Sequence, residues 1–207
     1  MFILFQIIIL LFSAIIHEWA HGYAAYRLGD DTAKNLGRLS LNPLVHLDLF
    51  GSIILPILLV LANFGFIFGY AKPVPFNPAK LKNWRYGIAK VAAAGPLSNL
   101  FIATFLGLMV RFLPASSFTQ FLALAVYINV LLAVFNLVPL PPLDGSKIIA
   151  SFLPIKIQNW LFSYETRIMP ISMVVIFMFF NLLTPVMNYL FIIFAGKESL
   201  LLLFNSF

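Results

Sequence analysis

Cysteine is absent from this sequence and charged residues are scarce. Only 10% of the 207 residues are charged, against about 25% in a soluble domain, while 62% are hydrophobic and the mean hydropathy is +0.99. Without cysteine the chain cannot form disulfides, thiolate metal ligands or cysteine nucleophiles, so any metal ion would be bound through nitrogen and oxygen. The low charge and high hydropathy argue against a water-soluble domain and indicate that lipid is the main solvent of the folded chain.

Acidic residues are also few. The chain has 13 lysines and arginines but only 7 acidic residues, which gives a formal net charge of +6. The basic residues are spread between apolar segments and form no single stripe or tail, so membrane topology explains them better than nucleic-acid binding. The clearest basic segment runs from Lys72 to Lys90 and contains no acidic residue. We therefore predict that this loop is cytoplasmic and that nucleic acid is not a partner.

Five apolar regions approach the ~20 residues with which a helix crosses a bilayer. They are residues 2–28, 49–70, 86–112, 118–138 and 168–204. The last region is interrupted at Thr184-Pro185 and at Lys197-Glu198, so it forms either one span with an interfacial tail or two spans. We predict an all-α polytopic membrane protein, a bundle of about five to six membrane segments in which residues 1–207 form a single domain.

The region 49–70 has two interpretations. It lies between two basic segments, 27–38 and 72–90, and a single crossing would place these segments on opposite sides of the membrane. Helix-breaking residues inside the region, such as Pro56 and Gly65, would let it enter the membrane and return as a re-entrant hairpin packed against protein. The alternative is an ordinary kinked span with a weaker charge bias.

The first apolar region contains the pattern H-E-x-x-H at His17, Glu18 and His21. Residues four apart lie on one face of a helix, so both imidazoles can reach one metal ion, and Glu18 is rotated enough to contact a metal-bound water as a general base. Each of these groups costs free energy inside a bilayer, on the order of 2.5–3.5 kcal/mol for a charged side chain near its centre. A metal site is therefore a better explanation than a polar cluster that only joins helices.

A catalytic zinc site of this kind needs a third protein ligand. The longer motif H-E-x-x-H-x-x-G-x-x-H is excluded, because its third histidine would stand at position 27, which is Arg27. The remaining histidine and acidic candidates are His46, Asp30, Asp31, Asp48, Asp144, Glu165 and Glu198. His46 lies in a polar loop beside Asp48, where a surface or loop-fixing role is the simpler interpretation.

Asp144 stands out among these candidates because it follows an apolar span and three prolines, Pro139, Pro141 and Pro142. Prolines lack a backbone N–H and disfavour helix before them, so we expect the chain here to be unwound and able to aim a carboxylate inward. Such backbone is tolerated at membrane depth only where protein or a water-filled cavity surrounds it. The alternative is a proline-rich turn at the interface with a solvated aspartate.

The segments H-E-W-A-H at 17–21, A-A-G-P-L-S-N at 93–99 and N-L-V-P-L-P-P-L-D-G at 136–145 together resemble the site-2 protease family of intramembrane zinc metalloproteases. The segment 38–78 is similar to a short bacterial-type branch that lacks an inserted PDZ or CBS domain. The resemblance covers most of residues 1–150, and the membrane segments within 168–204 carry no motif of the family. It implies one Zn²⁺ per chain, with His17, His21 and Asp144 as ligands and Glu18 activating the water.

From this resemblance we expect a zinc-dependent endopeptidase of the cell membrane that cleaves membrane-protein substrates in or near their transmembrane segments. Arg27 lies ten residues after His17, ~15 Å along a helix, and Asp144 lies three residues before Lys147, so the site should face the cytoplasmic leaflet. Substrates should carry helix-weakening residues, because a helix must unwind before its carbonyls can be attacked.

Two questions stay open at the level of sequence. Asn136 could donate hydrogen bonds to a substrate, as its position in the family motif implies, or it could join two helices. The same metal-binding residues would also suit a membrane metal-transport or metal-binding protein without hydrolytic activity. Replacement of Glu18 by Gln separates these functions, because only proteolysis needs the carboxylate as a base.

Overall fold

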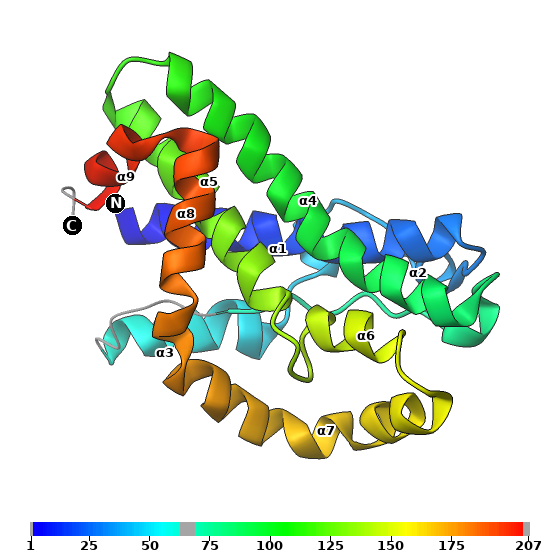
Figure 1. The fold of residues 1–207 in the computed structure, drawn as a ribbon. Helices are drawn as coiled ribbons and strands as arrows, with labels where there is room; N and C mark the ends of the chain where they lie inside the picture. The colour runs from blue at the N-terminus through cyan, green and yellow to red at the C-terminus, as the bar shows by residue number, and fades with distance from the viewer. Residues whose placement is uncertain (1, 63–68, 205–207) are drawn as a thin grey trace.

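The computed structural model of the chain describes residues 2–62 and 69–204 (Figure 1). Their regular structure is helical and includes no strand among the residues described. The long helices are α1 (Phe2–Arg27), α4 (Trp84–Phe112), α5 (Ser117–Asn136) and α7 (Ile155–Met178). The shorter ones are α2 (Thr32–Asn35), η1 (Pro43–Val45), η2 (Leu49–Ile54), α3 (Leu55–Leu61), η3 (Pro78–Lys80), α6 (Asp144–Ala150), η4 (Phe180–Leu182), α8 (Thr184–Ala195) and α9 (Lys197–Phe204).

The expected all-helical architecture is confirmed, but the expected five to six membrane segments are not. Among the described residues, three helical stretches are long and apolar enough to cross a bilayer, and they are Ile3–Arg27, Tyr86–Phe112 and Ser117–Asn136. A fourth is reached only if Arg167–Ile176 and Phe180–Ala195, which meet at a bend of 60°, count as one broken span. The number is not confirmed because two of the five apolar regions do not form one continuous long helix in the described part of the chain.

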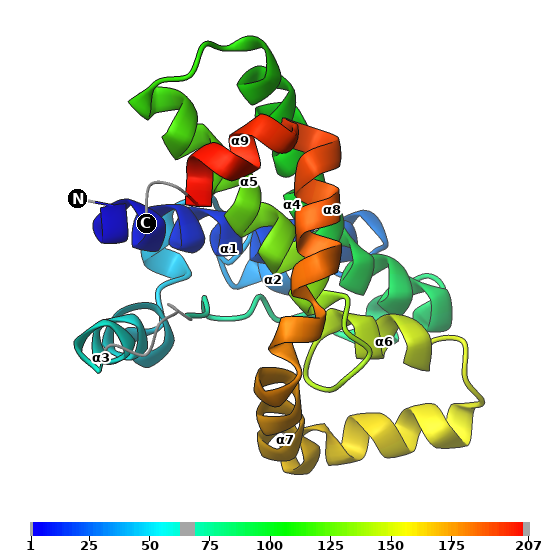
Figure 2. The same ribbon diagram turned by 60° about the vertical axis from the view of Figure 1, so that its left-hand side comes forward.

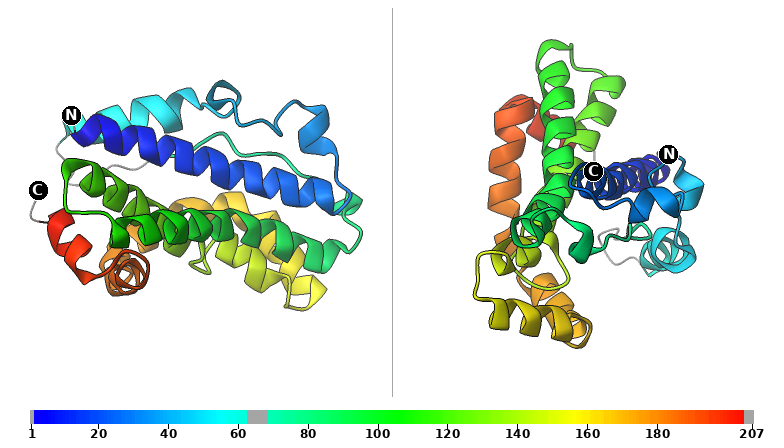
Figure 3. Two further views of the ribbon diagram at one scale, coloured as in Figure 1. Left: turned by 90° about the horizontal axis from the view of Figure 1, so that it is seen from above. Right: turned by 90° about the vertical axis from the view of Figure 1, so that its right-hand side faces the viewer.

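α1, α4 and α5 form the frame that carries the polar residues of the interior. Along α1, His21 and then His17 contact α4 at Val91 and then Asn99, so these two helices are antiparallel. Ser13 contacts Asn129, and the Phe5 ring packs at 4.3 Å from that of Phe121, so α1 and α5 are parallel. Figure 3 shows α1 and α4 extending side by side.

α5 lies at the centre of the packed core. More than half of its span residues are buried, whereas fewer than a fifth of those of α1 are. The main apolar cluster joins α5 to α4, α8 and α9, and its buried members include Ala103, Val126, Phe191 and Leu203. Burial of this kind orders α5, and therefore the proline-rich segment that follows it.

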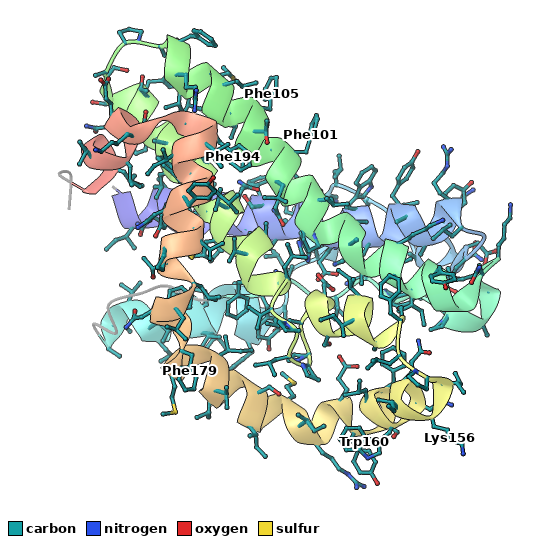
Figure 4. The ribbon with its side chains drawn as sticks, viewed as in Figure 1. Phe101, Phe105, Lys156, Trp160, Phe179 and Phe194 are labelled. Atoms are coloured by element: carbon teal, nitrogen blue, oxygen red, sulfur yellow. The ribbon has the colours of Figure 1, made fainter. Side chains whose placement is uncertain are left out.

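The outer face of α4 presents large apolar side chains to the surroundings. Phe101 is 74% exposed and Phe105 is 60% exposed, and both project away from the other helices (Figure 4). Leu97, Leu108 and Phe112 extend this stripe along the same helix. The stripe covers the C-terminal half of α4, and an exposed apolar stripe of this kind on a long helix is the surface expected to face lipid.

The region 49–70 returns to its starting point. Tyr70 donates its backbone N–H to Gly51 at 3.1 Å and accepts from the Ser52 hydroxyl at 2.8 Å, so the two ends of the region lie side by side. η2 and α3 form its outgoing arm, which lies beside the N-terminal half of α1 (Figure 3). Residues 63–68, which include Gly65, lie outside the described part of the chain. The paired ends have the geometry that the hairpin interpretation requires.

The last part of the chain breaks where the sequence suggested, since α8 begins at Thr184 and α9 at Lys197. α7 lies at the opposite end of the molecule from α9 (Figure 2). Arg111 at the end of α4 donates to the carbonyl oxygens of Ile192 and Phe194 at 3.0 and 2.9 Å. These carbonyls belong to the last turn of α8, where the Ile192 oxygen also accepts the backbone N–H of Gly196 at 3.0 Å. Arg111 therefore adds a side-chain cap to the end of α8 and holds it against α4.

Candidate metal centre

The two histidines of H-E-x-x-H lie on α1 with their rings directed towards α4. The Nδ1 atom of His17 lies 2.7 Å from Oδ1 of Asn99, and Nδ1 of His21 lies 2.7 Å from the carbonyl oxygen of Val91. Both oxygens are acceptors, so each histidine carries its ring proton on Nδ1. In the neutral ring, this tautomer leaves a lone pair on Nε2, which is the form in which a histidine binds a metal.

Asp144 reaches these Nε2 atoms from the other side of the site. It is the first residue of α6, directly after the non-helical segment 137–143, so the predicted break in the helix is confirmed. Its Oδ2 atom lies 3.1 Å from Nε2 of His17 and 3.2 Å from Nε2 of His21. The two Nε2 atoms are themselves 3.0 Å apart. Residues separated by more than a hundred positions therefore meet in one triangle of donor atoms.

This triangle has the dimensions of a metal site. In a tetrahedral zinc site with bonds of about 2.0–2.1 Å, two ligand atoms lie ~3.3–3.4 Å apart. The three observed separations, 3.0 to 3.2 Å, are slightly shorter, and the three side chains are only 8 to 11% exposed. His17, His21 and Asp144 are also the one such group of His, Asp and Glu found within the described residues.

The lone pairs of the three converging atoms also indicate a metal site. With both ring protons on Nδ1, each of the three converging atoms offers a lone pair and none offers a proton. Three acceptors at this distance repel one another unless a cation lies between them. The donor set of two imidazoles and one carboxylate, with a fourth position left open, fits Zn²⁺ and a water molecule.

Gly95 on α4 makes this arrangement possible. A Cβ atom at this position would lie 2.5 Å from Nε2 of His21 and 2.6 Å from Nε2 of His17. Any side chain would therefore occupy the space beside the donor atoms. Glycine at this position therefore lets α4 approach the helix that carries both histidines.

Glu18 does not belong to the triangle. Its Oε2 accepts from the backbone N–H of Val74 at 2.8 Å, and Val74 lies in an extended, non-helical segment beside α1. One end of that segment is anchored by Asp30, which is fully buried and accepts from the N–H of Asn77 at 2.5 Å. The other end is anchored by Arg38, which donates to the carbonyl of Lys72 at 2.9 Å. This segment holds one carboxylate oxygen of Glu18, and the other oxygen has no hydrogen bond to any of the described residues.

Two other residues considered from the sequence lie elsewhere. Asn136 ends α5, and its amide donates to the carbonyl of Leu132 in the same helix at 2.9 Å. His46 is fully buried and its Nε2 donates to the carbonyl of Ser40 at 2.7 Å, so it fixes a loop and is not a surface residue. Sequence reasoning missed Asn99 as a partner of His17. The available signal was its spacing, one helical turn after Gly95.

Fold and site together define a multi-pass membrane protein with a buried centre of two histidines and one carboxylate. Comparison with known proteins identifies the family. The model of Peptidase family M50 matches residues 112–180, which include Asp144. The Bacillus subtilis protein named "Putative zinc metalloprotease YwhC" is 36% identical over 215 residues, covering 98% of this chain and 91% of that protein.

Two further relatives match shorter parts. "Putative zinc metalloprotease Rip2" of Mycolicibacterium smegmatis is 35% identical over 142 residues, covering 65% of this chain and 52% of that protein. "Putative zinc metalloprotease MJ0611" of Methanocaldococcus jannaschii is 43% identical over 61 residues, covering 29% of this chain and 32% of that protein. No solved structure shows a significant match to the chain.

Because the similarity to the Bacillus protein extends over nearly all of both chains, the chain belongs to peptidase family M50, the site-2 protease family. The family resemblance stated from the three motifs is thereby confirmed. The protein is a zinc metalloprotease with Zn²⁺ as its cofactor, and its span-length helices make it a multi-pass membrane protein.

Proposed function

We propose that the protein is an intramembrane endopeptidase, which hydrolyses peptide bonds in or near the transmembrane segments of membrane-protein substrates. In this proposal His17, His21 and Asp144 bind the zinc ion and Glu18 is the catalytic base. The observation that carries it is the convergence of three donor atoms 3.0 to 3.2 Å apart, two of them on α1, a helix long and apolar enough to span a bilayer, and the third on α6.

The zinc ion, when bound, supplies a Lewis acid for the scissile carbonyl and lowers the pKa of a water molecule. Glu18 takes a proton from this water as the oxygen attacks the carbonyl carbon, and it gives the proton to the nitrogen as the C–N bond breaks. The hydrogen bond from Val74 holds one oxygen of Glu18, which leaves the second oxygen to carry the proton. Asp144 and the two histidines keep their positions throughout.

The membrane position of the site follows from the basic residues near it. His17 lies ~15 Å along α1 from Arg27, the last residue of that helix, and Asp144 is followed by Lys147 in α6. Lysine and arginine favour the cytoplasmic side. We infer that the protein lies in the cell membrane with its site within the bilayer, nearer the cytoplasmic leaflet.

A substrate peptide must be able to unwind near its cleavage site. The carbonyls of a transmembrane helix are bonded within the helix, so a substrate must unwind locally before Glu18 can direct water to it. Helix-weakening residues close to the cleavage site should therefore increase the rate. Asn136 is proposed to bind the exposed substrate backbone, for which its amide would exchange the bond to Leu132 for one to the substrate.

The test uses purified protein in lipid nanodiscs and a model transmembrane peptide. Glu18→Gln should abolish cleavage and leave bound zinc unchanged, whereas Asp144→Asn should lower both. Glu165→Gln is the matched control, because it removes a carboxylate that pairs with Lys147 at 3.8 Å outside the site. A Glu18→Gln protein that still cleaves, or that transports metal into liposomes as wild type does, would contradict the protease assignment of these residues.

A further inference from the structure

Three buried polar side chains continue the site away from the metal-binding atoms. Asn99 on α4 is fully buried, Asn129 on α5 is 1% exposed and Ser13 on α1 is 5% exposed. The amide nitrogen of Asn99 donates to Oδ1 of Asn129 at 2.9 Å and to the carbonyl oxygen of Ser13 at 3.3 Å. Its amide oxygen accepts from Nδ1 of His17 at 2.7 Å. The three helices of the frame are therefore joined at one polar point.

The orientation of both amides follows from fixed acceptors. Asn129 directs its nitrogen to the carbonyl oxygen of Ala125 at 2.9 Å and to the Ser13 hydroxyl at 3.0 Å. A backbone carbonyl can only accept, so the nitrogen of Asn129 must face Ala125 and its oxygen must face Asn99. Asn99 then has to turn its nitrogen to Asn129 and its oxygen to His17. The orientation of each amide is therefore fixed by the acceptor that its nitrogen contacts.

We propose that Asn99 and Asn129 are positioning residues that set the tautomer of His17. The chain of hydrogen bonds from the Ala125 carbonyl through Asn129 and Asn99 places the His17 proton on Nδ1 and leaves Nε2 free for zinc. A reversed Asn99 amide would present N–H groups to Nδ1, which would favour the proton on Nε2 and block that ligand. This inference rests on the proposed role of His17 as a zinc ligand.

His21 provides an internal comparison. Its Nδ1 donates to the backbone carbonyl of Val91, an acceptor that cannot reverse. Only His17 depends on an amide side chain, which can present either end. The Asn99 amide is oriented by two acceptors, the Ser13 carbonyl at 3.3 Å and the shorter contact to Oδ1 of Asn129 at 2.9 Å, which gives the buried Asn129 of α5 a role in orienting His17. If the two amides served helix packing alone, either the oxygen or the nitrogen of the Asn99 amide could face His17.

The experiment measures the tautomer in zinc-free protein and the zinc affinity separately. The chain has three histidines, so ¹⁵N-histidine labelling gives three pairs of ring-nitrogen signals, which replacement of His17, His21 or His46 assigns. The variants are Asn99→Leu, Asn99→Asp and Asn129→Leu. Ser98→Ala is the matched control, because within the described part of the chain the Ser98 hydroxyl bonds to the carbonyl of Gly95 in its own helix and to no other group.

In wild type and Ser98→Ala, we expect His17 to carry its proton on Nδ1. In Asn99→Leu, the proton should move towards Nε2, and zinc should bind ten- to a hundredfold more weakly, the usual cost of losing such a partner. Asn129→Leu should change the His17 tautomer and the zinc affinity in the same direction, but by smaller amounts. Asn99→Asp keeps an acceptor beside Nδ1, so it should keep the wild-type tautomer and more zinc affinity than Asn99→Leu. Its second oxygen would face the acceptors of Asn129 and Ser13, so this variant should also be less stable than wild type.

Two results separate failure of this inference from failure of the proposed function. If wild type binds zinc, His17→Ala loses it, and Asn99→Leu keeps both the wild-type tautomer and the wild-type affinity, the positioning role is wrong and the ligand assignment stands. If His17→Ala binds zinc as tightly as wild type, the ligand assignment itself is wrong. Equal losses in Asn99→Leu and Asn99→Asp would assign these residues to helix packing and overturn the inference.

Discussion

Replacement of Gly95 by alanine tests the site through a single methyl group. The new Cβ would lie 2.5 Å from Nε2 of His21 and 2.6 Å from Cε1 and Nε2 of His17. Ordinary van der Waals contact needs about 3.5 Å, so either α4 or both rings must move by ~1 Å. Metal–ligand distances tolerate about 0.2 Å, and a 1 Å displacement of a reacting group can cost ~100-fold in rate.

We therefore expect Gly95→Ala to bind zinc at least tenfold more weakly and to cleave a transmembrane peptide about a hundredfold more slowly. The helix itself should not suffer, since alanine is favoured over glycine by ~1 kcal/mol inside a helix. Zinc per folded protein would be measured by elemental analysis in nanodiscs, and cleavage by release of a labelled fragment.

The matched control is Gly107→Ala, on the same helix twelve residues, ~18 Å, further along. There the new Cβ would lie 2.8 Å from backbone and side-chain carbons of Phe194 on α8, so it creates a comparable clash outside the site. This variant should lose thermal stability but keep its zinc. If Gly95→Ala keeps wild-type zinc affinity and activity, or if both variants lose zinc equally, the argument from the space beside Gly95 fails.

Three further outcomes are expected. The native chain lacks cysteine, so single cysteines at Asn42 and at Lys80 should react with a membrane-impermeant maleimide from the same side in vesicles; labelling from opposite sides would contradict the hairpin at 49–70. A hydrogen bond and the charge of Lys80, at 2.6 Å, hold the pKa of Asp31 below its ordinary value. The ion pair is therefore fully formed at pH values above the usual carboxyl pKa, and it is lost as the pH falls through the lowered pKa. An NMR titration should show the Asp31 midpoint rising in Lys80→Gln, and an unchanged midpoint would refute the pairing. Chelation should abolish cleavage, and added Zn²⁺ should restore it; activity that survives complete zinc removal would exclude metal catalysis.

Part of this protein could be predicted from the sequence because local rules were sufficient. The first, third and fourth apolar regions became α1, α4 and α5 with ends shifted by two residues or fewer, since twenty apolar residues in lipid have few alternatives to a helix. The H-E-x-x-H spacing put both imidazoles on one face of α1, and the prolines before Asp144 ended the helical run before it.

The number of spans was not predictable in the same way. Region 49–70 has the apolar content of a span, yet its ends meet at Gly51 and Tyr70, and region 168–204 is divided between α7, α8 and α9. Hydropathy measures how readily a residue enters lipid and carries no information on where a helix bends. Pro185 and the charged pair Lys197-Glu198 indicated where the last region breaks, but the direction of the chain after a break depends on contacts with other helices, such as the cap that Arg111 places on α8.

The sequence alone determined that this chain folds in lipid, where its long helices form, and that the two imidazoles of H-E-x-x-H share one helix face. These properties depend on residues close together along the chain. The tertiary structure decided which carboxylate among seven acidic residues meets those imidazoles and which amide orients His17. These contacts join α1 to α4 and α6, and they require Gly95 to let two helices approach. Such distances arise from packing in three dimensions, which no local pattern of residues records.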